Sequence, residues 1–242
     1  MAPESASQRY ADPANPFVVL QQDERLIQMV DAALADATRR AGAHLACCPG
    51  CTQCCYGAFA INPLDALRLR TAIAEMVVDQ PAQAAAIAER ADRYLAEFGP
   101  SFPGNPQTGI LGTSDEDQEA FEDFANQAPC PALNLESGLC EMYDARPMTC
   151  RVFGPPVRMN SVSGVEAQAN SEPDEDEGLA VCELCFTEAS PEEIAEAEMV
   201  VPYAEEQRLL DQLDQLQQIQ PTAGDTIIAY CLRLPPALPE PS

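Results

Sequence analysis

The sequence contains no lysine, one histidine and no long apolar run. Its 13 basic residues are therefore all arginines, and 39 acidic residues bring the formal net charge to −26. A surface this acidic repels phosphate backbones, so we expect no nucleic-acid partner. A single histidine also excludes a zinc finger of the Cys2His2 type, which needs a histidine pair.

Segments typical of membrane insertion or export are lacking as well. No apolar stretch reaches the roughly 18 residues that a membrane-spanning helix requires, and residues 1–16 lack the apolar segment of a secretion signal. We therefore expect a cytoplasmic protein without a membrane partner. Glycine-rich nucleotide-binding motifs and a nucleophile elbow are also missing, so the sequence identifies no catalytic residue and leaves open whether the protein is an enzyme.

Cysteine, in contrast, is abundant, with eleven residues in a chain of 242. In a reducing compartment this abundance favours metal binding over disulfide bonds, and an odd number cannot pair completely. The chain is 46% hydrophobic and is long enough for one sizeable core. We thus expect one main domain that binds metal.

Helical periodicity and capping residues predict a mainly α protein, an irregular cysteine-cluster domain with helical flanks and one or two small β-hairpins. The predicted helices cover residues 23–45, 63–78, 81–98, a short segment after Ser114, a turn that carries Cys150, a segment after Ser190, and residues 202–220 and 225–234. The predicted hairpins lie in 133–142 and 157–167. The predicted organisation is a flexible arm (1–21), a metal-binding domain (22–200), C-terminal helices that pack on it (201–234) and a proline-rich tail (235–242).

Other predictions concern segments that connect or flank these elements. The Pro- and Gly-rich segment 99–113 predicts a long loop, and the acidic segment 170–178 predicts disorder. Pro49-Gly50 is expected to end the first helix. The 203–220 helix carries an apolar stripe that we expect to pack on the core, with a partner protein or self-association as the alternative; the stripe comprises Leu209, Leu213, Leu216 and Ile219.

The most informative motif reads Cys48-Pro-Gly-Cys51-Thr-Gln-Cys54-Cys55. Thiolates two residues apart can converge on one metal centre because the intervening turn points both sulfurs to one side. The adjacent Cys54 and Cys55 cannot easily do so, which indicates a bridged or multinuclear centre, or one ligand beside a supporting thiol. The spacing differs from a bacterial ferredoxin motif and from a zinc ribbon, so the site must be completed by tertiary folding.

Two further blocks complete a pattern that resembles the YkgJ-type cysteine-cluster proteins, described as zinc- or iron-chelating domains. These blocks are Cys130-Pro-Ala-Leu133 and Cys140-Glu-Met-Tyr-Asp-Ala-Arg-Pro-Met-Thr-Cys150-Arg151, and the likeness extends over about residues 45–190. It implies a cysteine-rich metal domain whose ligands are Cys48, Cys51, Cys54, Cys55, Cys130, Cys140 and Cys150, with Cys182 and Cys185 as further candidates. Flagellin lysine methylases carry a similar cluster thought to hold iron and sulfur, which favours an iron–sulfur centre such as 4Fe–4S over zinc or iron ions.

Several residues near these blocks remain open to two interpretations. Arg146 and Arg151 flank Cys150 and could offset the charge of a thiolate-bound cluster, or they could form plain salt bridges with Asp144 or Glu141. Tyr143 is expected in the core. His44 is expected to be incidental, and Cys47 and Cys231 are expected to be buried or spare thiols.

Three functions fit these features. The first is a metalloprotein whose iron–sulfur centre transfers electrons or supports a transferase-like reaction. The second is a protein-interaction module stabilised by zinc, and the third is metal storage or delivery.

Overall fold

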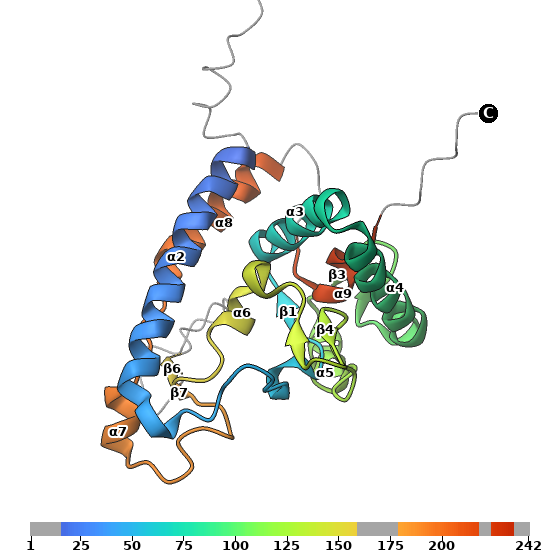
Figure 1. Ribbon diagram of the computed structural model, residues 1–242. Helices are drawn as coiled ribbons and strands as arrows, with labels where there is room; N and C mark the ends of the chain where they lie inside the picture. Colours follow the sequence, from blue (N-terminus) through green and yellow to red (C-terminus); the bar gives the residue numbers. More distant parts are fainter. Residues whose placement is uncertain (1–15, 159–178, 218–223, 235–242) are drawn as a thin grey trace, which may run out of the picture. The chain divides into compact units, whose positions relative to one another are not determined.

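The computed structural model describes residues 16–158, 179–217 and 224–234. This part of the chain is mainly α-helical and contains small two-stranded antiparallel sheets, which confirms the predicted fold class (Figure 1). It divides into two compact units. Unit 1 comprises Met1–Cys48 and Cys150–Gln212, and unit 2 comprises Pro49–Thr149 and Leu213–Ser242.

The described elements of unit 1 are the helices α2 (Pro16–Ala41) and α7 (Pro191–Glu196), the turn η1 (Gly42–His44), and the strands β6 (Val157–Arg158) and β7 (Leu179–Ala180). The helices α6 (Met148–Arg151) and α8 (Tyr203–Gln217) each contain a boundary between the units.

Helix α2 begins and ends earlier than predicted. It begins at Pro16, so residues 16–21 are helical rather than part of an arm, and Val19 is fully buried. It ends at Ala41 because Gly42 adopts a left-handed conformation (φ +52°), which glycine tolerates without strain. The prediction that Pro49-Gly50 ends this helix was therefore wrong.

The other elements of unit 1 agree with the sequence in part. Helix α7 begins with the predicted capping box, in which Ser190 and Glu193 bond each other's backbone N–H. Strand β6 pairs with β7, and the rest of the predicted 157–167 hairpin lies outside the described part of the chain. Leu209 on α8 is fully buried, as is nearly all of Leu213, whereas Leu216 and Ile219 lie outside the described side chains.

Unit 2 contains three longer helices and several short strands. The helices are α3 (Pro63–Asp79), α4 (Pro81–Phe98), α5 (Asp115–Asp123) and the short α9 (Ile228–Cys231). The strands form the pairs β1 (Ala60–Ile61) with β8 (Thr226–Ile227), β2 (Gly104–Asn105) with β3 (Ile110–Leu111), and β4 (Leu133–Asn134) with β5 (Leu139–Cys140). Short 3-10 turns are η2 (Gln53–Cys55), η3 (Gly99–Ser101) and η4 (Tyr143–Ala145).

Helices α3, α4 and α5 confirm the sequence predictions. Asn62 caps α3 by accepting a hydrogen bond from the Asp65 N–H, and Pro63 occupies the first turn. The buried face of α3 contains Leu64, Leu69 and Ile73, whereas Val77 is exposed. The predicted helix over 225–234 was also wrong in its first part, since residues 226–227 form β8.

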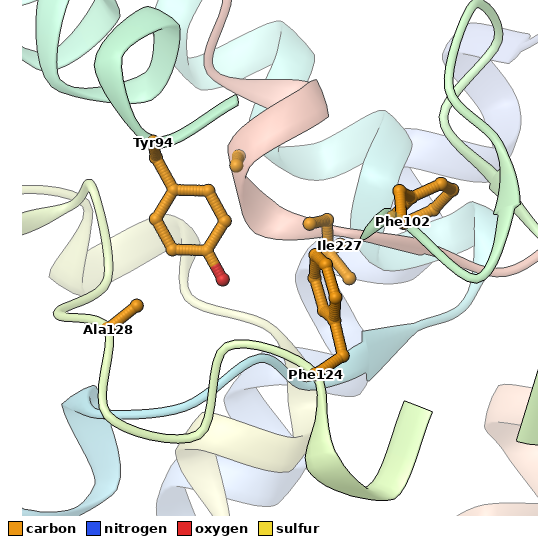
Figure 2. Packing of buried hydrophobic residues seen from close by; sticks show 6 residues of the cluster. Tyr94, Phe102, Phe124, Ala128 and Ile227 are labelled. Atoms are coloured by element: carbon orange, nitrogen blue, oxygen red, sulfur yellow. The ribbon is translucent and has the colours of Figure 1, made fainter. Parts of the chain in front are cut away.

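An aromatic cluster forms a core of unit 2 and joins segments far apart in sequence. The cluster contains Tyr94 from α4 and Ile227 from β8, together with Phe102, which follows η3, and Phe124, which follows α5. Ala128 also belongs to it (Figure 2). The Phe102 and Phe124 rings meet edge to face, with 5.7 Å between the ring centres.

No helix within the described residues is long and apolar enough to cross a membrane.

Candidate metal centre

The Cys51 loop lies beside the hairpin that carries Cys140. Gly138, in the turn between β4 and β5, has a positive φ of +69°. A Cβ atom at this glycine would lie 3.4 Å from the Gly50 carbonyl oxygen and 3.7 Å from the Thr52 methyl group. The two residues that flank Cys51 therefore pack against the hairpin turn.

Backbone pairing places Cys55 next to Cys130. The Cys130 N–H donates to the Cys55 carbonyl at 2.8 Å, and Tyr56 forms an antiparallel bridge with Pro129. The Cys55 N–H itself donates to the Thr52 carbonyl at 2.8 Å, closing the turn η2. Sequence spacing alone cannot show this pairing, because 74 residues separate the two segments.

The hairpin then joins Cys130 to Cys140. Leu133 is the register partner of Cys140, and the Leu133 N–H donates to the Cys130 carbonyl at 2.9 Å. Arg90 on α4 braces both ends of this arrangement. Its Nε donates to the Pro131 carbonyl at 2.8 Å, and its guanidinium forms an ion pair with Glu141.

The four thiols of Cys54, Cys55, Cys130 and Cys140 interact electrostatically. A hydrogen bond from the Cys55 thiol, aided by the Cys54 backbone N–H and the charge of Arg146, lowers the pKa of Cys54 to about 7 despite burial. The same hydrogen bond and burial raise the pKa of Cys55 far above its usual value. Burial raises the pKa of Cys130 to about 12, and burial also raises the pKa of Cys140.

Backbone amides are directed at two of these sulfurs. The N–H groups of Ala132 and Leu133 interact with the Cys130 sulfur, and the N–H of Met142 interacts with the Cys140 sulfur, in each case lowering the thiol pKa against the larger effect of burial. Hydrogen bonds of this kind stabilise sulfur in its anionic form, which is the form that binds metals.

The remaining candidate thiols belong to unit 1 or to its boundary. Cys182 and Cys185 form a tight turn, with the Cys185 N–H donating to the Cys182 carbonyl at 2.8 Å, and Cys185 is buried. Cys48 is exposed, and Cys150 lies on α6. A role for these residues as ligands stays a prediction from the sequence.

Residues outside the pattern have the following surroundings. Cys231 is buried on α9, as predicted, whereas Cys47 is exposed. His44 stacks on Phe186 at 5.7 Å, and its Nε2 lies 3.5 Å from a Glu193 carboxylate oxygen.

The structure corrects the expectation for Tyr143 and gives an ion-pair partner for Arg151. Tyr143 is 60% exposed rather than in the core, and the Arg146 guanidinium lies 3.8 Å from the centre of its ring. Arg151 forms an ion pair with Asp31 on α2, at 2.6 Å. The contact between Arg151 and Asp31 depends on tertiary packing, because the two residues are 120 positions apart in sequence.

Three charged residues of unit 2 were not singled out from the sequence, namely Asp65, Arg68 and Arg90. Asp65 and Arg68 are buried on α3 and form an ion pair at 2.6 Å. A charged pair with i,i+3 spacing among the apolar residues of a helix was the available signal.

A family model described as "CxxCxxCC: Putative zinc- or iron-chelating domain" matches residues 46–175. The match covers more than half of the chain, so the protein belongs to this family of cysteine-cluster domains, and its general function is metal binding. No curated protein and no solved structure matches the chain.

The donor set fits a metal centre in its chemistry. Its thiols are soft donors of the kind that bind zinc, iron or iron–sulfur clusters, and amide groups together with Arg146 can offset their negative charge. Within the described residues, however, no group of three or more His, Cys, Asp or Glu side chains is already arranged to hold an ion.

Proposed function

We propose that unit 2 binds a thiophilic metal centre through Cys51, Cys54, Cys55, Cys130 and Cys140, and that this centre is an iron–sulfur cluster. The hydrogen bond between the adjacent Cys54 and Cys55 thiols is the observation that carries the proposal. The charges of Cys130 and Cys140 also raise the pKa of Cys55, so four thiols interact with one another. A single tetrahedral zinc ion uses four ligands. Two adjacent thiols among five candidates suit a centre with several metal atoms better.

Such a cluster would supply electron transfer, or support a methyl-transfer reaction as the likeness to flagellin lysine methylases suggests. The protein's own residues would contribute the surroundings of the cluster. Arg90 would hold the Cys130 and Cys140 segments together, and amide groups and Arg146 would stabilise the thiolates.

Protein purified without oxygen tests this proposal through its visible spectrum and its content of iron, inorganic sulfide and zinc. We expect a brown protein that contains iron and sulfide, and a Cys54→Ala variant that loses both. A colourless protein with stoichiometric zinc and no sulfide would contradict the iron–sulfur assignment.

A structural zinc site that supports protein docking is the second candidate. It is favoured by apolar side chains that are exposed close to the cysteines in sequence, namely Tyr56, Leu135, Leu139 and Tyr143. Because Leu209 and Leu213 are buried within the chain, these exposed side chains fit a partner better than the apolar stripe of α8 does. Stoichiometric zinc in the analysis above would favour this candidate.

A further inference from the structure

Unit 2 buries two charged residues on helix α3. Asp65 and Arg68 are 2% and 8% exposed, and the Asp65 Oδ1 accepts a hydrogen bond from the Arg68 Nη1 at 2.6 Å. Buried charges are costly unless they are paired and hydrogen-bonded. Asp65 lies in the first turn of the helix, where the helix dipole favours a negative charge.

This pair also contacts a segment about 80 residues away in sequence. The same Asp65 oxygen accepts a hydrogen bond from the Met148 N–H at 3.0 Å, and the Arg68 Nη1 lies 3.4 Å from the Arg146 carbonyl oxygen. Pro147 lies between these two contacts, and its ring restricts the backbone further. The ion pair therefore holds the backbone on both sides of Pro147.

The residue held in this way is Arg146, whose side chain is also buried. Its guanidinium lies over the Tyr143 ring at 3.8 Å, and its Nη1 donates to the Tyr143 carbonyl at 3.4 Å. From this position its positive charge acts on the sulfurs of Cys54 and Cys140.

We propose that Asp65 and Arg68 are positioning residues that hold the Arg146 charge beside Cys54 and Cys140 and thereby strengthen metal binding there. This inference rests on the proposed metal site. The ion pair itself need not approach the metal, because its effect passes through the backbone around Pro147. Loss of the pair should thus weaken binding only as long as Arg146 is present.

The test is a Co²⁺ titration of the anaerobic, metal-free full-length protein, followed by the thiolate-to-cobalt charge-transfer absorption. Arg146→Gln should weaken binding about tenfold to a hundredfold, as expected for a residue that supports metal ligands, and Arg146→Lys should restore most of the affinity. Arg93→Gln removes an exposed arginine from α4 and is the matched charge control, with no expected change.

The ion pair is tested with two double variants. Asp65→Ala/Arg68→Met removes both charges and both contacts to the Arg146 segment, and it should weaken Co²⁺ binding about tenfold. Asp65→Asn/Arg68→Gln keeps an acceptor and a donor at these positions and should recover most of the affinity. Pro147→Gly, which loosens the held backbone without changing α3, should also weaken binding and serves as the test if the first variant does not fold.

The decisive comparison introduces these changes into the Arg146→Gln protein. We expect Asp65→Ala/Arg68→Met or Pro147→Gly to cause no further loss there, because the charge that they position is absent. An additive loss, or unchanged affinity in the wild-type background, would overturn the positioning role alone. Co²⁺ binding that is insensitive to Cys54→Ala would instead overturn the proposed site, and this inference with it.

Discussion

At the scale of residues, the adjacent thiols Cys54 and Cys55 have opposite properties. Cys54 accepts a hydrogen bond from Cys55, so the negative charge of this thiol pair resides on Cys54. Nearby, burial raises the pKa of Cys130 to about 12, so this thiol holds its proton to high pH. A bound metal would replace these protons, which couples binding to pH and to folding.

The different pKa values predict selective alkylation of the metal-free protein. Cys54 should react with iodoacetamide at a rate that rises through a pH of about 7, because only the thiolate is nucleophilic and its pKa is lowered to that value. Cys130, with its pKa raised to about 12, should remain unmodified over the same range. Site-resolved mass spectrometry at increasing pH measures both, and equal rates at the two thiols would contradict the prediction.

Substitution of single cysteines should separate ligands from spare thiols. Cys54→Ala should lose the metal together with metal-linked folding energy, which is on the order of 10 kcal/mol for structural zinc. Cys231→Ala should retain the metal and lose roughly 1 kcal/mol of stability, because this small side chain is buried in the core. Bound metal and thermal unfolding are measured for both variants.

The same assay tests Cys150, which the sequence pattern assigns as a ligand. Metal loss in Cys150→Ala would support this assignment. Metal loss in Cys231→Ala would show that α9 belongs to the site, contrary to our expectation, and full retention in Cys54→Ala would exclude the proposed centre.

At the scale of elements, helix α3 shows how capping and tertiary packing act separately. Asn62 and Pro63 set where the helix begins, since they satisfy or remove backbone N–H groups of its first turn. They do not decide which face of the helix is buried. That face contains Leu64, Leu69 and Ile73 together with the Asp65–Arg68 pair.

The observed burial of α3 predicts unequal costs of truncating its apolar side chains. Leu69→Ala should lower the free energy of unfolding by about 2–5 kcal/mol, because Leu69 is fully buried and its loss leaves a cavity. Val78→Ala, at a position 79% exposed on the same helix, should change it by less than about 0.5 kcal/mol. Urea unfolding of both variants measures the difference, and similar costs would show that the helix packs differently.

At the scale of the whole molecule, the dominant property is the net charge of −26. Ion pairs involve several of the arginines, including Arg151 with Asp31 and Arg90 with Glu141. Excess carboxylates therefore determine the electrostatic potential around the chain, and this potential opposes contact with other polyanions.

This charge predicts that the protein does not bind nucleic acid. Mixed-sequence DNA or RNA should not retain it at physiological ionic strength, because 13 arginines among 39 acidic residues supply too little positive charge to displace counterions from phosphates. Electrophoretic mobility shifts at several salt concentrations measure this. Retention that weakens with added salt would contradict the prediction.

Much of the fold could be predicted because local chemistry specifies it. The limits of α3 and α4, the capping box of α7 and the hairpin that carries Cys140 each depend on residues close together in sequence. The strand β8 could not be predicted, because it exists only through pairing with β1, about 165 residues earlier. Residues 225–234 therefore carried a helical pattern that tertiary pairing overrode in part.

The sequence by itself determined the family, the thiol-rich chemistry of the site and the acidic character of the surface, since these follow from residue types and their spacing. Only the tertiary structure decided that Cys55 lies beside Cys130, that Arg90 braces Cys130 and Cys140 through their neighbours, and that the Asp65–Arg68 pair holds the Arg146 segment. The physical reason is that each of these contacts joins backbone and side-chain groups from segments distant in sequence. Local spacing carries no record of such contacts, because they form only when the buried groups find partners in the folded chain.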